Sequence, residues 1–223
     1  MGPDPFVADL DEVGFRYSSY DTPFWARPNS VPGRWHDRGD GPTQYLSLSA
    51  AGSWAELIRR ERVSSEGEVA QVRIQMWIVE MSLGDLADYR DFDRADAAGF
   101  PPDALVDDDY RRCQAEGRRL RAEGFGGVIA PSAALPEEVN VTVFGPRYSV
   151  RWGARPVLAS AIPAAVVAVG CPPAGLVGRV RQLGDRHAAL REHEIVAAAR
   201  LGEQLRRHPR ETPDLPGPSD RAE

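Results

Sequence analysis

The clearest hydrophobic pattern in the chain is a long alternation of apolar and polar residues at positions 69–81. Successive side chains of a β-strand point to opposite faces, so Val72, Ile74 and Met76 fall on the same side of this stretch. The alternation continues for longer than it does anywhere else in the chain. It therefore predicts a central strand.

Other stretches with β-forming composition are shorter. Further strands are predicted at residues 14–18, 43–48 and 140–144, and two short apolar runs follow at 157–158 and 165–169. Residues 83–89 are typical of a strand exit followed by a turn. The long connection at 21–42 is rich in Pro, Gly, Asp and Asn, and loops of this length that carry aromatic and Arg residues are usually functional.

Helical spacing of apolar residues appears in three regions. Residues 49–62 predict a helix capped by Ser49 or Ser53, and residues 107–123 predict one that begins with acids, ends with bases and stops at Gly124. Residues 91–107 read as loop or short helix. The Arg-, Ala- and Leu-rich stretch 176–207 predicts one or two surface helices.

The order of these elements indicates the fold class. Several predicted strands follow one another through loops, without the long helical crossovers of a doubly wound parallel sheet. We therefore expect an α+β fold with a mixed, mostly antiparallel sheet and flanking helices. No G-x-G-x-x-G motif follows a strand, so a Rossmann dinucleotide site is not supported.

Length and charge narrow the class of protein. With 223 residues and 24.4 kDa, the chain has room for one catalytic domain with an appendage. The net charge of -6 repels phosphate backbones, so direct nucleic-acid binding is not expected. No apolar run has the roughly 18 to 20 residues of a membrane span, and no secretory signal is visible, which indicates a cytoplasmic protein.

The basic residues are all Arg, because the sequence contains no Lys. This excludes the P-loop Lys, Schiff-base chemistry and a Lys general base. Any anion site must then use Arg side chains, backbone N–H groups or helix N-termini. Cys113 and Cys171 are too few and too far apart for a disulfide scaffold or a zinc site, and no metal is expected.

Four polar residues in or beside these loops are candidates for chemistry. Arg16 lies on the first predicted strand, and Arg34 lies in the long loop. Glu56 lies in the predicted helix at the edge of its apolar face, where a carboxylate needs a partner to stay charged, and Arg16 or Arg34 could supply it. Ser132 follows Pro131 at a strand end. We interpret the nearby His36 as an exposed loop residue.

These residues belong to a series of short motifs in a characteristic order. The series comprises Phe15-Arg16-Tyr17, Gly33-Arg34-Trp35, Tyr45-Leu46-Ser47, Ala55-Glu56, Asp85-Leu86, Cys113-Gln114-Ala115-Glu116-Gly117, Gly126-Gly127-Val128 with Pro131-Ser132-Ala133, and Asn140-Val141-Thr142-Val143-Phe144. Each motif is unspecific alone, but their ordered combination resembles the RES domain family over residues 14–169. The resemblance divides the chain into a lead-in at 1–13, a RES-like catalytic domain at 14–172, a helical extension at 173–208 and a disordered tail at 209–223.

The resemblance also implies a fold and an activity. Members of the family resemble the ADP-ribosyltransferase fold, with a split sheet, and degrade NAD+, by phosphorolysis in characterised toxins that have Xre-type antitoxins as partners. By motif, the resemblance makes Arg16, Arg34, Glu56 and Ser132 the expected catalytic residues. It makes Tyr17, Trp35, Tyr45 and Ser47 the expected substrate-binding residues, with NAD+ and phosphate as substrates and no further cofactor.

The chemistry is consistent with these residue types. Cleavage of the nicotinamide–ribose bond passes through an oxocarbenium-like state that a carboxylate such as Glu56 stabilises, although Glu56 could instead hold the ribose hydroxyls. The Arg16 and Arg34 guanidinium groups suit phosphate. Transfer of ADP-ribose to a protein and an inactive NAD-binding module remain alternatives. The acceptor, the antitoxin and the oligomeric state are not determined by the sequence.

Overall fold

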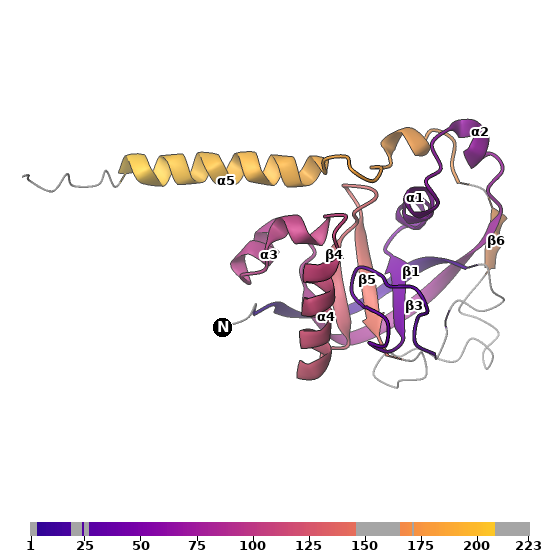
Figure 1. Ribbon diagram of the computed structural model, residues 1–223, viewed down its shortest axis with the longest axis horizontal. Coiled ribbons are helices and arrows are strands. Elements are labelled where there is room, and N and C mark those ends of the chain that lie inside the picture. Colours follow the sequence, from indigo (N-terminus) through magenta and orange to yellow (C-terminus); the bar gives the residue numbers. More distant parts are fainter. Residues whose placement is uncertain (1–3, 19–23, 25–26, 146–165, 171, 208–223) are drawn as a thin grey trace, which may run out of the picture.

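The computed structural model describes residues 4–18, 24, 27–145, 166–170 and 172–207. Its strands form one six-stranded sheet, ordered β1-β2-β5-β4-β3-β6, with helices packed around it (Figure 1). The strands are β1 (Phe6–Ser18), β2 (Thr43–Ser47), β3 (Ile74–Asp88), β4 (Gly127–Pro131), β5 (Val139–Phe144) and β6 (Val166–Gly170). The expected α+β class with flanking helices is confirmed.

The sheet closes on itself, which differs from the split sheet that we expected. β1 pairs with β3 over almost its whole length and meets β2 at Phe15↔Ser47, so β1, β2, β5, β4 and β3 form a ring that β6 extends. β1 and β3, with 13 and 15 residues, are the longest strands. Their length makes the closure possible, because β1 can pair with both β3 and β2, and β3 with both β1 and β4. Only the β3–β4 pairing is parallel among the described strands. The likeness to the ADP-ribosyltransferase fold stays a prediction.

The first strand begins earlier than the sequence indicated. Residues 6–13 belong to β1, so the expectation of a loose lead-in up to residue 13 is wrong for most of that segment. A register shift between Ala8 and Leu10 interrupts the alternation, which removes the strand signal from the sequence. The backbone pairing with β3 nevertheless holds the segment in place, from Phe6 opposite Asp88 onwards.

The predicted central strand is displaced along the chain. β3 begins at Ile74 and continues to Asp88, whereas Glu66–Val69 forms the short helix α2 with a capping box between Ser65 and Glu68. Only Val69 of the predicted stretch lies in this helix, and a turn at residues 70–71 follows before the strand begins. Residues 166–170 form β6, and the predicted apolar run at 157–158 lies outside the described residues.

A first apolar cluster fills the ring. Side chains from all five closed strands point inward, among them Leu10, Leu46, Trp77, Ile129 and Val141. Opposite residues of paired strands share a face, so the inward set of one strand fixes the inward set of its neighbour. The remaining side chains of these strands point outward, toward the helices.

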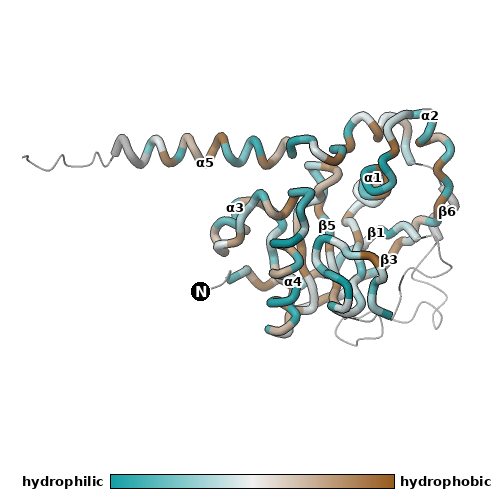
Figure 2. The backbone as a smooth tube through the Cα atoms, viewed as in Figure 1, coloured by the Kyte–Doolittle hydropathy of each residue, from teal (hydrophilic) through white to brown (hydrophobic). Residues whose placement is uncertain are grey.

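Two further clusters lie between the ring and its helices. α1 (Ala50–Glu61) begins at Ser49, whose hydroxyl accepts from the Gly52 N–H at 2.9 Å, and it buries Trp54, Ala55 and Ile58 against the ring. α3 (Phe92–Ala97), η1 (Pro102–Leu105) and α4 (Arg111–Glu123) cover another part. Figure 2 shows hydrophilic residues along most of α4, whose buried face is correspondingly narrow.

The C-terminal part contains η3 (Val177–Arg179) and the long helix α5 (Ala188–Arg207). Beyond its first turns α5 extends away from the rest of the molecule (Figure 1). It is tied to α3 through Asp93, which pairs with His193 and Arg200. No helix in the described part of the chain is long and apolar enough to cross a membrane.

Candidate active site

Glu56 of α1 is the centre of a hydrogen-bonded group of polar side chains. Its Oε1 atom accepts from the hydroxyl of Ser132 and from the amide Nδ2 of Asn140, both at 2.7 Å. Asn140 in turn accepts at Oδ1 from the Ser47 hydroxyl at 2.7 Å. No hydrogen bond reaches Oε2 from any residue that the structure describes, so this oxygen is left for a ligand.

The sheet register brings these four side chains together. Ser47 lies opposite Asn140 in the β2–β5 pair, and both point outward because the adjacent pair, Leu46 and Val141, points into the ring. Ser132 directly follows β4, the other neighbour of β5. Its hydroxyl also accepts from the N–H groups of Ala134 and Leu135, each at 3.1 Å, which fixes its direction toward α1.

Arg34 lies on the loop before β2 and is held by backbone carbonyls. Its Nη1 atom donates to the carbonyls of Ala104 at 3.3 Å and Asp107 at 2.7 Å, and its guanidinium carbon lies 4.6 Å from the centre of the Tyr110 ring. The Nη2 atom is buried and has no partner among the described residues. The partly exposed guanidinium therefore brings a fixed positive charge to this loop.

Tyr45 and His36 form a buried pair below this loop. The Tyr45 hydroxyl accepts from the Trp35 N–H at 3.0 Å and lies 2.8 Å from Nδ1 of His36, whose Nε2 is 3.0 Å from the Val31 carbonyl. Burial raises the pKa of Tyr45 and lowers that of His36. His36 is only 2% exposed, so our interpretation of it as an exposed loop residue is wrong.

The ring of Trp35 belongs to the core. It is 2% exposed and stacks on Tyr89 at 6.4 Å between ring centroids, with Phe100 at 6.3 Å. No face of the indole is left for a nucleotide. The expectation that Trp35 binds substrate is therefore corrected, and its position shows that it anchors the loop that carries Arg34.

Arg16 points to the opposite side of β1 from the other candidates. It is paired with Trp77 on the inner face of the ring, whereas its neighbours Phe15 and Tyr17 pack outward near α1. Its Nη1 atom donates to the Tyr45 carbonyl at 2.9 Å. Burial lowers the pKa of Arg16 to about 10, so it stays charged at neutral pH.

Tyr17 connects the two sides of the site electrostatically. Burial raises its pKa, Arg60 of α1 opposes this by charge and hydrogen bonding, and the charges of Glu56 and Arg16 also act on it. Arg60 is in turn within electrostatic reach of Tyr110, on which Arg34 lies.

The predicted residues are only partly gathered in one place. Glu56, Ser132 and Ser47 share one network, and the charge of Glu56 acts on Tyr17. Arg34 is bonded to the Ala104 and Asp107 carbonyls, and Arg16 to the Tyr45 carbonyl. Neither Arg16 nor Arg34 forms an ion pair with Glu56 in the described part of the chain, because neutral donors from Ser132 and Asn140 take that role. The sequence did not predict three further residues of this region: Asn140, Arg60 and Tyr110.

Of these, Asn140 had a detectable signal. It stands at the first outward position of the motif Asn140-Val141-Thr142-Val143-Phe144, where a polar amide interrupts an apolar strand. Arg60 and Tyr110 carry no comparable signal, because an Arg on a helix surface and a Tyr at a helix start are common. Only their contacts across the fold place them at the site.

Comparison with known proteins identifies the class to which this fold and site belong. The RES domain family matches residues 10–157, about two thirds of the chain, and the chain belongs to this family. The probable NAD(+) phosphorylase Rv3189 of Mycobacterium tuberculosis is 34% identical over 119 residues, which are 53% of this chain and 56% of that protein. The chain thus matches little more than half the length of this relative.

A solved structure shares the fold. A chain in the crystal structure of the M. tuberculosis MbcT–MbcA toxin–antitoxin complex superposes with a TM-score of 0.50 and 23% identity, covering 67% of this chain and 80% of that chain. At this level of identity the likeness concerns the fold alone.

Proposed function

We propose that this RES domain degrades NAD+ by cleaving the bond between nicotinamide and ribose, with inorganic phosphate as the acceptor. The observation that carries the proposal is the Glu56 carboxylate, which Ser132 and Asn140 hold by one oxygen while the other has no partner among the described residues. A fixed carboxylate is what an oxocarbenium-like transition state requires. The relative named as a probable NAD(+) phosphorylase supports the choice of substrate.

Glu56 acts on the ribose in this proposal. Oε2 of Glu56 faces the developing positive charge on the ribose, or holds a ribose hydroxyl so that the sugar is presented in a reactive pose. Nicotinamide leaves as a neutral molecule from a cationic ring, so the site needs no general acid. This agrees with a network built from a Ser, an Asn and a Glu, without a titrating His in contact with Glu56.

Arg34 supplies the positive charge for phosphate groups. Its Nη1 is occupied by two backbone carbonyls, which orient the guanidinium plane, and the delocalised charge of the group can attract phosphate. Tyr17 borders the sugar side of the same surface. Arg16 does not contact the substrate in this proposal. Its hydrogen bond to the Tyr45 carbonyl holds β2 in position beside the Glu56 network. We further propose that an Xre-type antitoxin covers this site, in line with the toxin–antitoxin complex that shares the fold.

Nicotinamide release from NAD+ tests the proposal. We expect the wild-type protein to release nicotinamide faster with phosphate than without, and Glu56→Gln to slow release about 100-fold, the usual loss for an electrostatic group of this kind. Gln keeps an oxygen for Ser132 and Asn140, so the fold is retained. The control is Glu80→Gln, which removes an exposed carboxylate of β3 and leaves the rate unchanged.

Other outcomes distinguish the competing functions. Label from NAD+ that accumulates on a protein, with little free product, supports ADP-ribosyl transfer. Calorimetric binding of NAD+ without turnover supports an inactive binding module. Equal rates for wild type and Glu56→Gln would remove Glu56 from the mechanism.

A further inference from the structure

A segment outside the family match is packed against the site. Residues 177–187 follow the matched range 10–157, yet three hydrogen bonds join them to the turn that carries Ser132. The Arg181 N–H donates to the Ala134 carbonyl at 2.8 Å, the Arg181 Nη1 atom donates to the Ala133 carbonyl at 3.3 Å, and Nε2 of His187 lies 3.0 Å from the Ser132 carbonyl. We call residues 177–187 the clasp.

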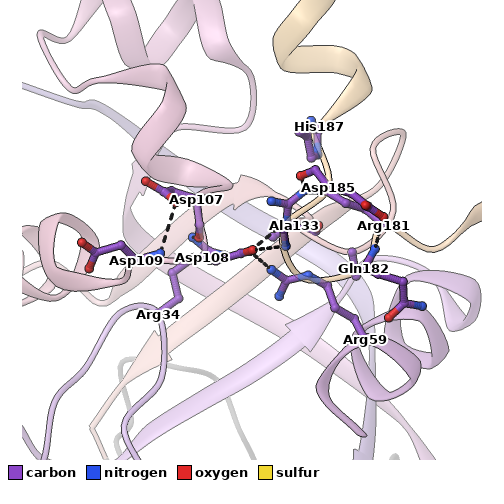
Figure 3. Close-up of polar contacts among 12 residues, drawn as sticks. Arg34, Arg59, Asp107, Asp108, Asp109, Ala133, Arg181, Gln182, Asp185 and His187 are labelled. Atoms are coloured by element: carbon purple, nitrogen blue, oxygen red, sulfur yellow. Dashed lines mark hydrogen bonds and ion pairs between the residues drawn. The ribbon is translucent and has the colours of Figure 1, made fainter. Parts of the chain in front are cut away.

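Asp108 ties the clasp to α1. Its carboxylate accepts from Arg181 at 3.1 Å, from Arg59 of α1 and from the backbone N–H of Gly184 at 2.6 Å (Figure 3). Burial alone would raise the pKa of Asp108, but the Gly184 N–H and the two Arg residues lower it below its ordinary value. Arg59 lies one helical turn after Glu56, so the clasp is connected to both sides of the Glu56–Ser132 hydrogen bond.

The hydrogen bonds of His187 define its tautomer. The Leu190 N–H donates to Nδ1 at 3.3 Å, so Nδ1 is unprotonated and the proton is on Nε2, which donates to the Ser132 carbonyl. The ring is 2% exposed and packs edge-on against Phe92 at 5.6 Å between centroids. Burial lowers the pKa of His187, and the charges of Arg181, Arg34 and Arg59 act in the same direction. The ring is therefore neutral and held in one orientation.

We propose that His187 is a positioning residue that holds the Ser132 peptide so that the Ser132 hydroxyl points at Glu56. This inference rests on the proposed function of Glu56 and adds a residue to that site from outside the family match. The carbonyl of Ser132 is fixed by His187, and its hydroxyl is fixed by the N–H groups of Ala134 and Leu135. If the carbonyl is released, the peptide can rotate, and the donor to Glu56 loses its direction.

His187 makes two hydrogen bonds, one to the Ser132 carbonyl and one that caps the helix at the Leu190 N–H. Two substitutions distinguish the effects of these bonds. Asn places an oxygen where Nδ1 lies, so His187→Asn keeps the cap on the Leu190 N–H but is too short to reach Ser132. Gln places its amide nitrogen near the position of Nε2, so His187→Gln keeps the bond to Ser132 but loses the cap. The control is His193→Asn, since His193 also contacts Phe92 and, among the described residues, pairs with Asp93 alone.

The kinetic expectation follows from these geometries. We expect His187→Asn to lower kcat for nicotinamide release about 10-fold with the KM for NAD+ within about 2-fold, because substrate contacts are unchanged. The conservative variant His187→Gln retains at least about half of the wild-type kcat. A normal kcat in His187→Asn, or equal losses in the Asn and Gln variants, would overturn the assignment.

A second measurement does not depend on activity. Amide hydrogen exchange of Ala134 and Leu135 reports the bonds to the Ser132 hydroxyl. We expect faster exchange at both amides in His187→Asn, and wild-type exchange in His187→Gln and His193→Asn. Unchanged exchange in His187→Asn overturns the positioning role. A wild-type protein that releases no nicotinamide while showing this exchange pattern contradicts the proposed function alone.

Discussion

At the scale of single residues, the site combines charged groups with buried neutral ones. Glu56 stays partly accessible and uses uncharged donors, whereas His36 and His187 are each 2% exposed and bonded at both ring nitrogens. Nδ1 of His187 accepts from the Leu190 N–H, so the His187 ring can make both of its bonds only in the neutral form. The neutral state of His187 is thus part of the folded structure.

Stability is therefore expected to depend on pH. Burial lowers the pKa of His36 and of His187 below the ordinary value of 6.5, so the unfolded chain takes up these protons at a higher pH than the folded chain. The contribution is complete above about pH 6.5 and is lost as the pH falls below it. Urea unfolding between about pH 7 and pH 5 measures this, and we expect a smaller loss in His187→Gln. A flat profile contradicts the prediction.

At the scale of elements, close backbone contact decides where α4 lies. A Cβ atom on Gly117 would lie 2.4 Å from the Trp35 carbonyl oxygen, and Arg121 of the same helix donates to that carbonyl at 3.0 Å. The helix therefore approaches the loop backbone more closely than a side chain would allow. Since Arg34 precedes Trp35, this contact also positions the Arg34 side chain.

Gly117→Ala tests this contact. We expect it to destabilise the protein by about 2 kcal/mol, a usual cost of overpacking, although Ala is the better helix former. We also expect Gly117→Ala to change the rate of nicotinamide release, because the loop that carries Arg34 must shift. The matched change is Gly178→Ala, whose added methyl group meets nothing within 4 Å. Chemical denaturation of both variants gives the comparison, and equal stabilities would contradict the prediction.

At the scale of the whole molecule, segments distant in sequence hold the site together. The ring is closed by β1 and β3, the helices lie outside it, and the clasp joins α1 to the turn after β4 through Asp108. The side chains of Arg59 and Arg181 are 5% and 8% exposed. Two buried guanidinium groups thus depend on one carboxylate for their charge balance.

Asp108→Asn is expected to destabilise the protein by about 3 kcal/mol, the low end for removing one partner of buried ion pairs, because Asp108 is itself partly accessible. The neighbouring Asp109 pairs with the exposed Arg111, so Asp109→Asn leaves stability unchanged within error. Urea denaturation of the two variants measures the difference. Similar midpoints for both would show that the clasp is not held by Asp108.

The amino-acid sequence by itself determined most of the local elements and the family. Helix signals at Ser49 and Gly124, the β-rich stretch before Glu56 and the ordered RES motifs depend on neighbouring residues, whose propensities and spacing are visible along the chain. The same local reading failed at residues 6–13, where pairing with β3 makes a strand without an alternating pattern.

Only the tertiary structure decided how these residues meet. The closed ring turned Arg16 inward and Glu56 toward Ser132 and Asn140, placed Trp35 in the core, and brought His187 to the Ser132 carbonyl. These outcomes depend on strand register and on contacts between residues far apart in sequence. The pattern along the chain does not indicate such contacts, because their partners come together only in the folded structure.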